Sequence, residues 1–327
     1  MPDLYYLAFR DITSTGTGVT SGEVYVQQGV TAATAWPNVQ LTAKDWVPWD
    51  QVGAVFRNKR VCFLVHGFNV PVSHAIWCEG PAAQEYEALG NLGLQITAAD
   101  IVVTVMWPGD GLPGWDWFTA YTHSKDVGGK FAEFLASRAF TGSEVSFISH
   151  SLGARVVLET VAQATGVRAS FGTAVLMAAA VGDNALDLPD YAAGSAKLDR
   201  IVILSSMKDV ILQVFYTAGS IAEQALWSDY DETSKALGRY GPAFAAKSKI
   251  PPKTEWYEIK PGNSQDHGDY LPDGSGPQAW KNTKPQHVGI FCRNLFDDQP
   301  LLPDLPVDWG TDRTKSFRPD WTPKFPQ

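Results

Sequence analysis

The sequence has little cysteine, which excludes a disulfide scaffold and the common zinc-binding patterns. Among its 327 residues only Cys62, Cys78 and Cys292 are cysteines; they lie far apart, and no C-x-x-C pair occurs. Cys62 stands in an apolar run, where a buried free thiol is the expected state. A single Cys62–Cys292 or Cys78–Cys292 disulfide is an alternative that nothing in the sequence requires.

Long apolar runs and clusters of positive charge are also missing. No stretch reaches the roughly 18 to 20 consecutive apolar residues of a membrane span, so we expect no transmembrane segment. Lysine and arginine number 26 against 35 for aspartate and glutamate, and the resulting net charge of −9 disfavours binding to nucleic acid. The opening residues, MPDLYYLAFRD, lack the basic and apolar regions of a signal peptide, so a cytoplasmic location is the default expectation.

Motifs for nucleotides and metal ions are missing as well. Neither a G-x-x-x-x-G-K-[ST] loop nor a G-x-G-x-x-G turn at the start of a helix is present. The acidic strings SDYDET (228–233) and DHGD (266–269) have no accompanying ligand set at fixed spacing, so we interpret them as solvated loops. We therefore expect neither a cofactor nor a metal ion.

What the chain does contain is an alternation of apolar strands and helical segments. Short runs rich in valine, isoleucine and phenylalanine predict strands, and several look buried on both faces, as in a parallel sheet. The predicted strands are 4–10, 23–28, 60–67, 100–107, 143–150, 171–180, 200–206 and 254–260, and the predicted helices are 74–92, 117–139 and 152–165. This alternation predicts an α/β fold with a doubly wound, mostly parallel sheet.

Three parts of the chain depart from the regular alternation in the core, 59–296. Residues 1–58 predict an N-terminal β extension of the same domain. Residues 210–253 are too long for a simple crossover and look helical, so we interpret them as an insertion or cap. The proline-rich segment 297–327 is expected to be extended.

The string VSFISHSLGARVVLE, residues 145–159, carries the strongest chemical signal in the chain. It runs from a predicted strand directly into a predicted helix, with Ser151 at the corner. A residue at such a corner adopts a strained conformation and projects its side chain above the sheet, which requires small residues two positions to either side. Ser149 and Gly153 meet this requirement, although G-x-S-x-G is the commoner form. We therefore predict that Ser151 is a nucleophile.

A nucleophilic serine needs hydrogen-bond donors for the oxyanion of the reaction intermediate. The first core strand ends in HGFN, where the N–H of Phe68 can point at a developing oxyanion, and the N–H of Leu152 at the helix start supplies a second donor. His66 and Asn69 beside this loop are candidates for contact with substrate. We expect His66, and His150 beside the nucleophile, to pack or form hydrogen bonds locally and not to act as bases.

The base and its orienting acid are expected in the chain order Ser, Asp or Glu, His. Asp209 follows the 200–206 strand and is the favoured acid, with Asp183, after the preceding strand, as the alternative. His267 lies in a polar loop that can lean toward Ser151 and is the favoured base. His287, at the predicted start of a helix, is the alternative base.

Aromatic residues gather after the strand that ends at Trp107. Trp107, Trp115, Trp117 and Phe118 are close in sequence and follow a carboxyl end of the sheet. Contacts within the core or cap explain such residues most simply. Their position also makes them candidates for lining an apolar acyl or aryl pocket.

Three strings together resemble the α/β-hydrolase superfamily, and within it a branch of serine hydrolases. They are HGFN at 66–69, WPGDG at 107–111 and HSLG at 150–153. The resemblance covers residues 60 to 295. It implies a triad of Ser151, Asp209 and His267, with Phe68 and Leu152 as oxyanion donors.

Ser149 in place of glycine, and the long path from His267 to the last helix, depart from the pattern of that superfamily. The expected activity is hydrolysis of a small-molecule ester with an apolar acyl or aryl group. Thioester hydrolysis, acyl transfer and a non-catalytic binding module on the same fold are the alternatives. The sequence leaves the oligomeric state open.

Overall fold

A computed structural model of the chain describes most of the core and parts of both flanks. The described residues are 2–10, 19–27, 46–68, 89, 92–93, 95–109, 116–226, 232–244, 249–251, 253–259, 266–271, 283–300 and 311–312. Asn69, Cys78, Trp115, most of the predicted helix 74–92 and most of the segment 297–327 lie outside these residues.

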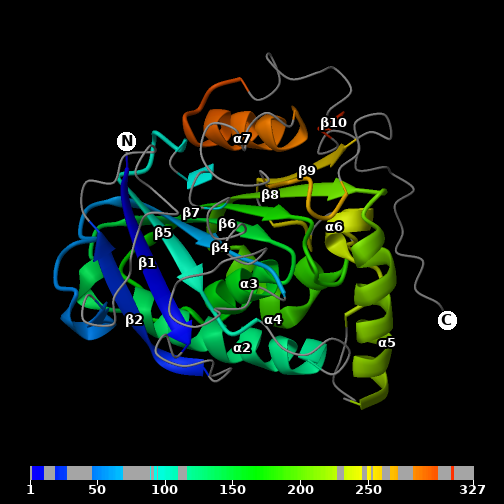
Figure 1. Cartoon of the computed structure of the whole chain (residues 1–327), viewed down its shortest axis with the longest axis horizontal. Coiled ribbons are helices and arrows are strands. Elements are labelled where there is room, and N and C mark those ends of the chain that lie inside the picture. Colours follow the sequence, from blue (N-terminus) through cyan, green and yellow to red (C-terminus); the bar gives the residue numbers. More distant parts are fainter. Residues whose placement is uncertain are drawn as a thin grey trace.

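One mixed, mostly parallel sheet forms the centre of the molecule (Figure 1). Within the described residues its strands lie in the order β10-β9-β8-β7-β6-β4-β5-β1-β2-β3. All neighbours from β9 to β1 are parallel, and β10, β2 and β3 are added antiparallel at the two edges. The strands are β1 Asp3–Arg10, β2 Val19–Gln27, β3 Trp46–Pro48, β4 Arg60–Val65, β5 Ile101–Met106, β6 Glu144–His150, β7 Ser170–Met177, β8 Leu198–Ser206, β9 Thr254–Ile259 and β10 Thr311–Asp312.

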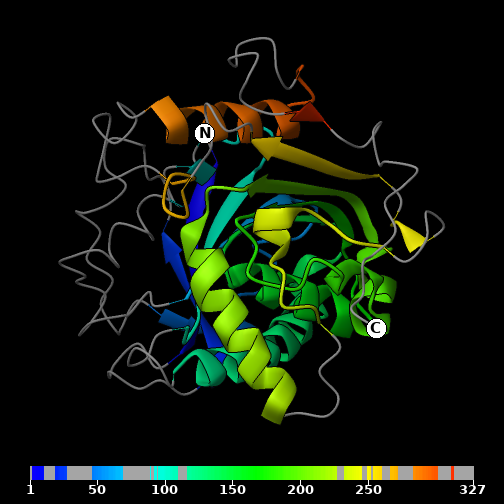
Figure 2. The same cartoon turned by 90° about the vertical axis from the view of Figure 1, so that its right-hand side faces the viewer.

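Helices cover both faces of this sheet. Figures 1 and 2 show α7 on one face and α2, α3 and α4 on the other. The helices are α2 Asp116–Leu135, α3 Gly153–Gln163, α4 Pro189–Ser195, α5 Thr217–Leu226, α6 Leu237–Tyr240 and α7 Thr283–Phe296. Short 3-10 turns are η2 Trp49–Gln51, η3 Arg138–Phe140 and η4 Ala185–Asp187, and η5 Leu212–Tyr216 is a π-helical stretch that leads into α5. The predicted fold class, an α/β fold with a doubly wound, mostly parallel sheet, is therefore confirmed.

The central strands form because their apolar side chains are buried on both faces. Every residue of β5 is buried, and in β4 and β6 only the first residue is exposed. Phenylalanines join the sheet to α2: the rings of Phe63 and Phe131 lie 4.8 Å apart, and Phe147 packs 5.9 Å from Phe131. This core holds the ends of the strands, where the polar residues of interest lie, in fixed positions.

The N-terminal segment belongs to the same sheet as the core. β1 pairs in parallel with β5, and β2 and β3 follow it antiparallel. At the other end of the core, the described part of the 210–253 insertion contains η5, α5 and α6. No helix within the described ranges is both long and apolar enough to cross a membrane.

The disulfide alternatives raised by the sequence are wrong for Cys292. Cys62, in β4, and Cys292, in α7, are both free thiols buried in the core. Burial raises the pKa of the Cys292 thiol to about 12, so it stays protonated and unreactive at neutral pH. For Cys62 the expected buried free thiol is found.

Candidate active site

Ser151 stands at the sharp corner between β6 and α3. Its φ angle is +53°, in the left-handed region that residues other than glycine seldom adopt. Three backbone hydrogen bonds hold it there: its N–H donates to the Met177 carbonyl at 3.0 Å, and its own carbonyl accepts from the N–H groups of Ala180 at 3.0 Å and Ala154 at 3.1 Å. Strain maintained in this way is a common property of functional positions.

The small residues around Ser151 have a direct steric reason. A Cβ at Gly153 would lie 2.5 Å from the Val65 carbonyl and 2.4 Å from the His66 carbonyl, because α3 starts against the end of β4. Ser149 is fully buried, and its hydroxyl donates to the Val175 carbonyl at 3.2 Å. Serine fits at 149 because its one polar atom finds this partner in β7.

His267 connects Ser151 to Asp209. Its Nε2 lies 3.0 Å from the Ser151 Oγ, and its Nδ1 lies 2.8 Å from an Asp209 carboxylate oxygen. Since the carboxylate only accepts, the hydrogen-bond pattern assigns the ring proton to Nδ1 and leaves Nε2 to accept the serine hydroxyl. The Asp209 side chain is fully buried and that of His267 is 16% exposed, so the base alone of the two reaches solvent.

Asp209 is fixed by two further contacts. Its second carboxylate oxygen accepts the Leu212 N–H at 2.8 Å, which makes Asp209 the cap of the helical segment that begins at residue 210. Its carbonyl accepts from the Arg239 guanidinium at 2.6 Å. Each carboxylate oxygen thus has its own donor, one in the helix and one in His267.

The loop that carries His267 is closed by its own acidic residues. The Asp266 N–H donates to the Asp269 carboxylate at 2.8 Å, and the Asp269 N–H donates to the Asp266 carbonyl at 3.0 Å. His150, next to the nucleophile, donates from Nε2 to the His267 carbonyl at 2.9 Å. The string DHGD therefore builds a turn, and among the described residues no group of His, Cys, Asp and Glu could hold a metal ion.

The alternative acid and base are engaged elsewhere. The Asp183 carboxylate accepts a hydrogen bond from the Thr233 hydroxyl, and burial raises its pKa to about 6. His287 lies in α7, where burial lowers its pKa, and within the described residues it makes no hydrogen bond to Ser151 or Asp209. The structure brings His267 and Asp209, and not these alternatives, to the serine.

The HGFN loop runs directly against the nucleophile. A Cβ at Gly67 would lie 2.7 Å from the Ser151 Cβ, so the Gly67 backbone packs closely against the Ser151 side chain. Within the described residues, no hydrogen-bond acceptor is paired with the N–H of Phe68 or of Leu152. As far as the described part of the chain extends, both N–H groups are thus available as donors.

His66 sets the orientation of this loop. Its Nε2 accepts the Trp107 backbone N–H at 3.1 Å, which leaves Nδ1 protonated to donate to the Gly67 carbonyl at 2.8 Å. In a trans peptide the N–H points opposite to the carbonyl, so the Phe68 N–H faces away from His66. The Trp107 indole also donates to the His66 carbonyl at 2.9 Å.

The candidates for substrate contact divide into two groups. His66 and Trp107 are fully buried, so they support the loop from beneath and cannot line a pocket. Trp117 is partly buried, and its ring lies 5.6 Å from that of Phe68, beside the oxyanion loop. Asn69 and Trp115 lie outside the described residues.

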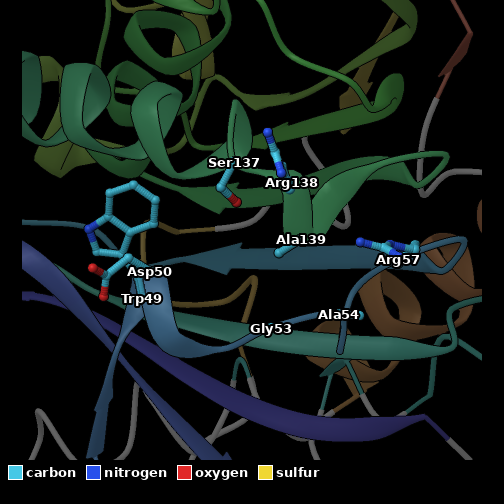
Figure 3. A pocket seen from close by; sticks show the side chains of 8 residues that line it. All are labelled: Trp49, Asp50, Gly53, Ala54, Arg57, Ser137, Arg138 and Ala139. Atoms are coloured by element: carbon cyan, nitrogen blue, oxygen red, sulfur yellow. The ribbon is translucent and has the colours of Figure 1, made fainter.

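A separate hollow of about 330 Å³ lies between η2 and the turn after α2 (Figure 3). Arg57, Ser137 and Arg138 are among the residues that line it. These residues precede the starts of β4 and β6, whereas Ser151 follows the end of β6. The hollow therefore lies at the amino-terminal ends of the strands, whereas Ser151 lies at their carboxyl ends.

The fold is compatible with that of an α/β hydrolase, since a mostly parallel sheet carries a strained serine at the end of a central strand. Comparison with known proteins adds no relationship: no family model matches the chain, and no curated protein has a matching sequence.

Proposed function

We propose that this protein is a serine hydrolase that cleaves carboxylic esters. The observation that carries the proposal is the hydrogen-bonded chain from the strained Ser151 through His267 to the buried Asp209, with distances of 3.0 and 2.8 Å. Nucleophile, base and orienting acid in this arrangement are the minimal machinery of acyl transfer through a covalent intermediate.

Each residue has one role in the proposed mechanism. As the Ser151 Oγ attacks the ester carbonyl, His267 Nε2 takes the hydroxyl proton, and Asp209 stabilises the imidazolium without accepting its proton. The N–H groups of Phe68 and Leu152 donate to the oxyanion of the tetrahedral intermediate. His267 then protonates the departing alcohol, and an incoming water that it deprotonates releases the acid from Ser151.

Covalent labelling tests this proposal most directly. A fluorophosphonate probe reacts with an activated serine because its phosphorus accepts the nucleophile and mimics the tetrahedral intermediate. We expect stoichiometric labelling at Ser151, located by mass spectrometry of the digested protein. Labelling spread over surface serines, or none in the folded protein, would show that Ser151 is not activated.

The contact between Gly67 and Ser151 gives a second prediction. Gly67→Ala places a methyl group 2.7 Å from the Ser151 Cβ, so the loop or the nucleophile must shift. Because small displacements of reacting groups are costly, we expect kcat/KM to fall by roughly 10²-fold. Steady-state kinetics on a soluble ester provide the measurement.

Gly129→Ala is the matched control for this change. A Cβ at Gly129, in α2, would meet only the flexible end of the Gln163 side chain, which can move away. We expect this variant to keep full activity. Equal losses in both variants, with unchanged folding of Gly67→Ala, would contradict the assigned position of the oxyanion loop.

A further inference from the structure

The helical segment that follows Asp209 exposes an apolar face to solvent. Within the described residues, all large hydrophobic side chains that are strongly exposed lie in this segment or in the turn just before Asp209, with exposed fractions from 42% to 61%. They are Met207, Val210, Ile211, Val214, Phe215 and Ile221. We call these six residues the outer apolar face.

The exposure of this face is unusual because the segment is apolar on its buried inner side and on its outer side as well. Leu212 and Tyr216 on the inner side are 2% and 1% exposed, while Val214 and Phe215 on the outer side are 53% and 61% exposed. A helix that is apolar on all sides is normally buried on all sides. The largest exposed apolar patch on a protein surface is often functional.

The segment that carries the outer apolar face begins beside the candidate active site. The segment starts at the carboxyl end of β8, directly after Asp209, and α5 stands beside the edge of the sheet toward which the β8 arrow points (Figure 1). The ring of Tyr216 lies 6.1 Å from that of Trp117, which in turn contacts Phe68 of the oxyanion loop. The segment that carries the face therefore packs, through its inner side, beside the oxyanion loop.

The charges near the outer apolar face limit the kinds of partner that can bind there. Between Met207 and Ile221 the one exposed charge is Lys208, because Asp209 is fully buried. The face thus offers no pattern of charges that a charged partner could complement. The net charge of −9 also repels an anionic membrane surface.

The area of the face distinguishes a lipid surface from a second copy of the chain. A stable protein–protein interface buries about 800 Å² on each partner, with close shape complementarity. Six side chains, five of them from one helical segment, supply only roughly a few hundred Å². The boundary between headgroups and acyl chains accepts a single apolar helix face without a matching shape, and the affinity follows the apolar area.

We propose that the outer apolar face docks the protein on the surface of uncharged or zwitterionic lipid assemblies. Docking would present esters embedded in that surface to Ser151. The docking itself stands on the exposed face alone, whereas the assignment of lipid esters as the substrate class rests on the proposed function.

The test measures binding and catalysis separately. The Ser151→Ala protein, which cannot turn over, is mixed with phosphatidylcholine vesicles, and the bound fraction is measured by co-sedimentation. We expect saturable binding that changes little with salt, and a loss of about tenfold or more in the partition coefficient on adding Val214→Ser and Phe215→Ser. Gln213→Ser, on the same segment but outside the face, is the matched control and is expected to bind normally.

Activity then tests the substrate class. With Ser151 intact, the Val214→Ser and Phe215→Ser changes should lower hydrolysis of a vesicle-embedded ester and leave hydrolysis of a short, soluble ester unchanged. Thermal unfolding confirms that each variant is folded.

Several results would overturn the proposal. These are no vesicle binding by the parent protein, binding that the face variants do not weaken, and binding that requires anionic lipid and is lost in salt. A dimer in size-exclusion chromatography that the face variants dissociate would instead assign the face to contacts between copies. Vesicle binding without any ester hydrolysis would leave docking intact and refute the proposed function.

Discussion

Replacing Ser151 by alanine is expected to lower kcat for ester hydrolysis by about 10⁴- to 10⁶-fold, since the members of such a triad act as a unit. The change removes the Oγ that lies 3.0 Å from His267 Nε2 and leaves the base without a proton to take. Alanine has the same backbone restriction as serine at φ +53°, so folding should be little affected. Steady-state kinetics and thermal unfolding measure the two effects.

Ser149→Ala is the matched control, two residues earlier in the same strand. It removes the hydrogen bond to the Val175 carbonyl, but the Ser149 hydroxyl has no contact with the reacting groups. We expect a change in kcat of less than about tenfold, because a single buried hydrogen bond affects mainly stability. Comparable activity of Ser151→Ala and Ser149→Ala would exclude the serine-nucleophile mechanism.

Asp209→Asn is expected to lower kcat by roughly 10²- to 10⁴-fold, by analogy with the loss seen when a triad aspartate becomes asparagine. Asparagine keeps an oxygen to accept the Leu212 N–H, so the helix cap survives. Its amide group would then face His267 Nδ1, which favours the ring tautomer with the proton on Nε2. That tautomer cannot accept the Ser151 proton, and the loss should appear in kcat more than in KM.

Asp183→Asn is the control variant: it removes a buried carboxylate that does not contact His267, so it shows how much kcat falls when any buried carboxylate is lost. Asp183 contacts Thr233 and not His267, so we expect kcat to fall by about tenfold or less. The opposite ranking of the two variants, with both folded, would assign the acid to Asp183.

The same variant has a pH-dependent effect on stability whose sign follows from burial. The Asp183 pKa is raised from 3.8 to about 6, so the folded state binds this proton more tightly than the unfolded state. Its contribution to the free energy of unfolding is therefore complete below about pH 4 and is lost as the pH rises through 6. Asp183→Asn should be more stable than the parent at pH 7, by up to roughly 3 kcal/mol, and no more stable near pH 4.

The strands, and Ser151 and Asp209 just after two of them, could be predicted because each depends on a local pattern. Apolar runs that are buried on both faces mark β4 to β8, and parallel strands bring their carboxyl ends to one edge. Ser151 and Asp209 follow two of these strands. The approach of Ser151 and Asp209 to His267 therefore requires few long-range contacts beyond those of the sheet itself.

Other parts of the site depend on contacts between distant residues and could not be predicted. The tautomer of His66 is determined by the Trp107 N–H, 41 residues later in the chain. That pairing also explains why Trp107 is buried in the core and does not line a pocket. The exposure of Phe215 was equally hidden, because an apolar helix in a sequence looks the same whether its outer side is covered or not.

The capping role of Asp209 defines how the insertion can be exchanged. One carboxylate oxygen accepts the Leu212 N–H at the start of the helix, and the other accepts from the His267 ring. The helix start and the imidazole therefore cannot change orientation independently of each other. A chimera that imports a different insertion must therefore retain the first helical turn after β8 as part of the scaffold. It must also retain Arg239, because this residue, which lies in the same insertion, donates from its guanidinium to the Asp209 carbonyl at 2.6 Å.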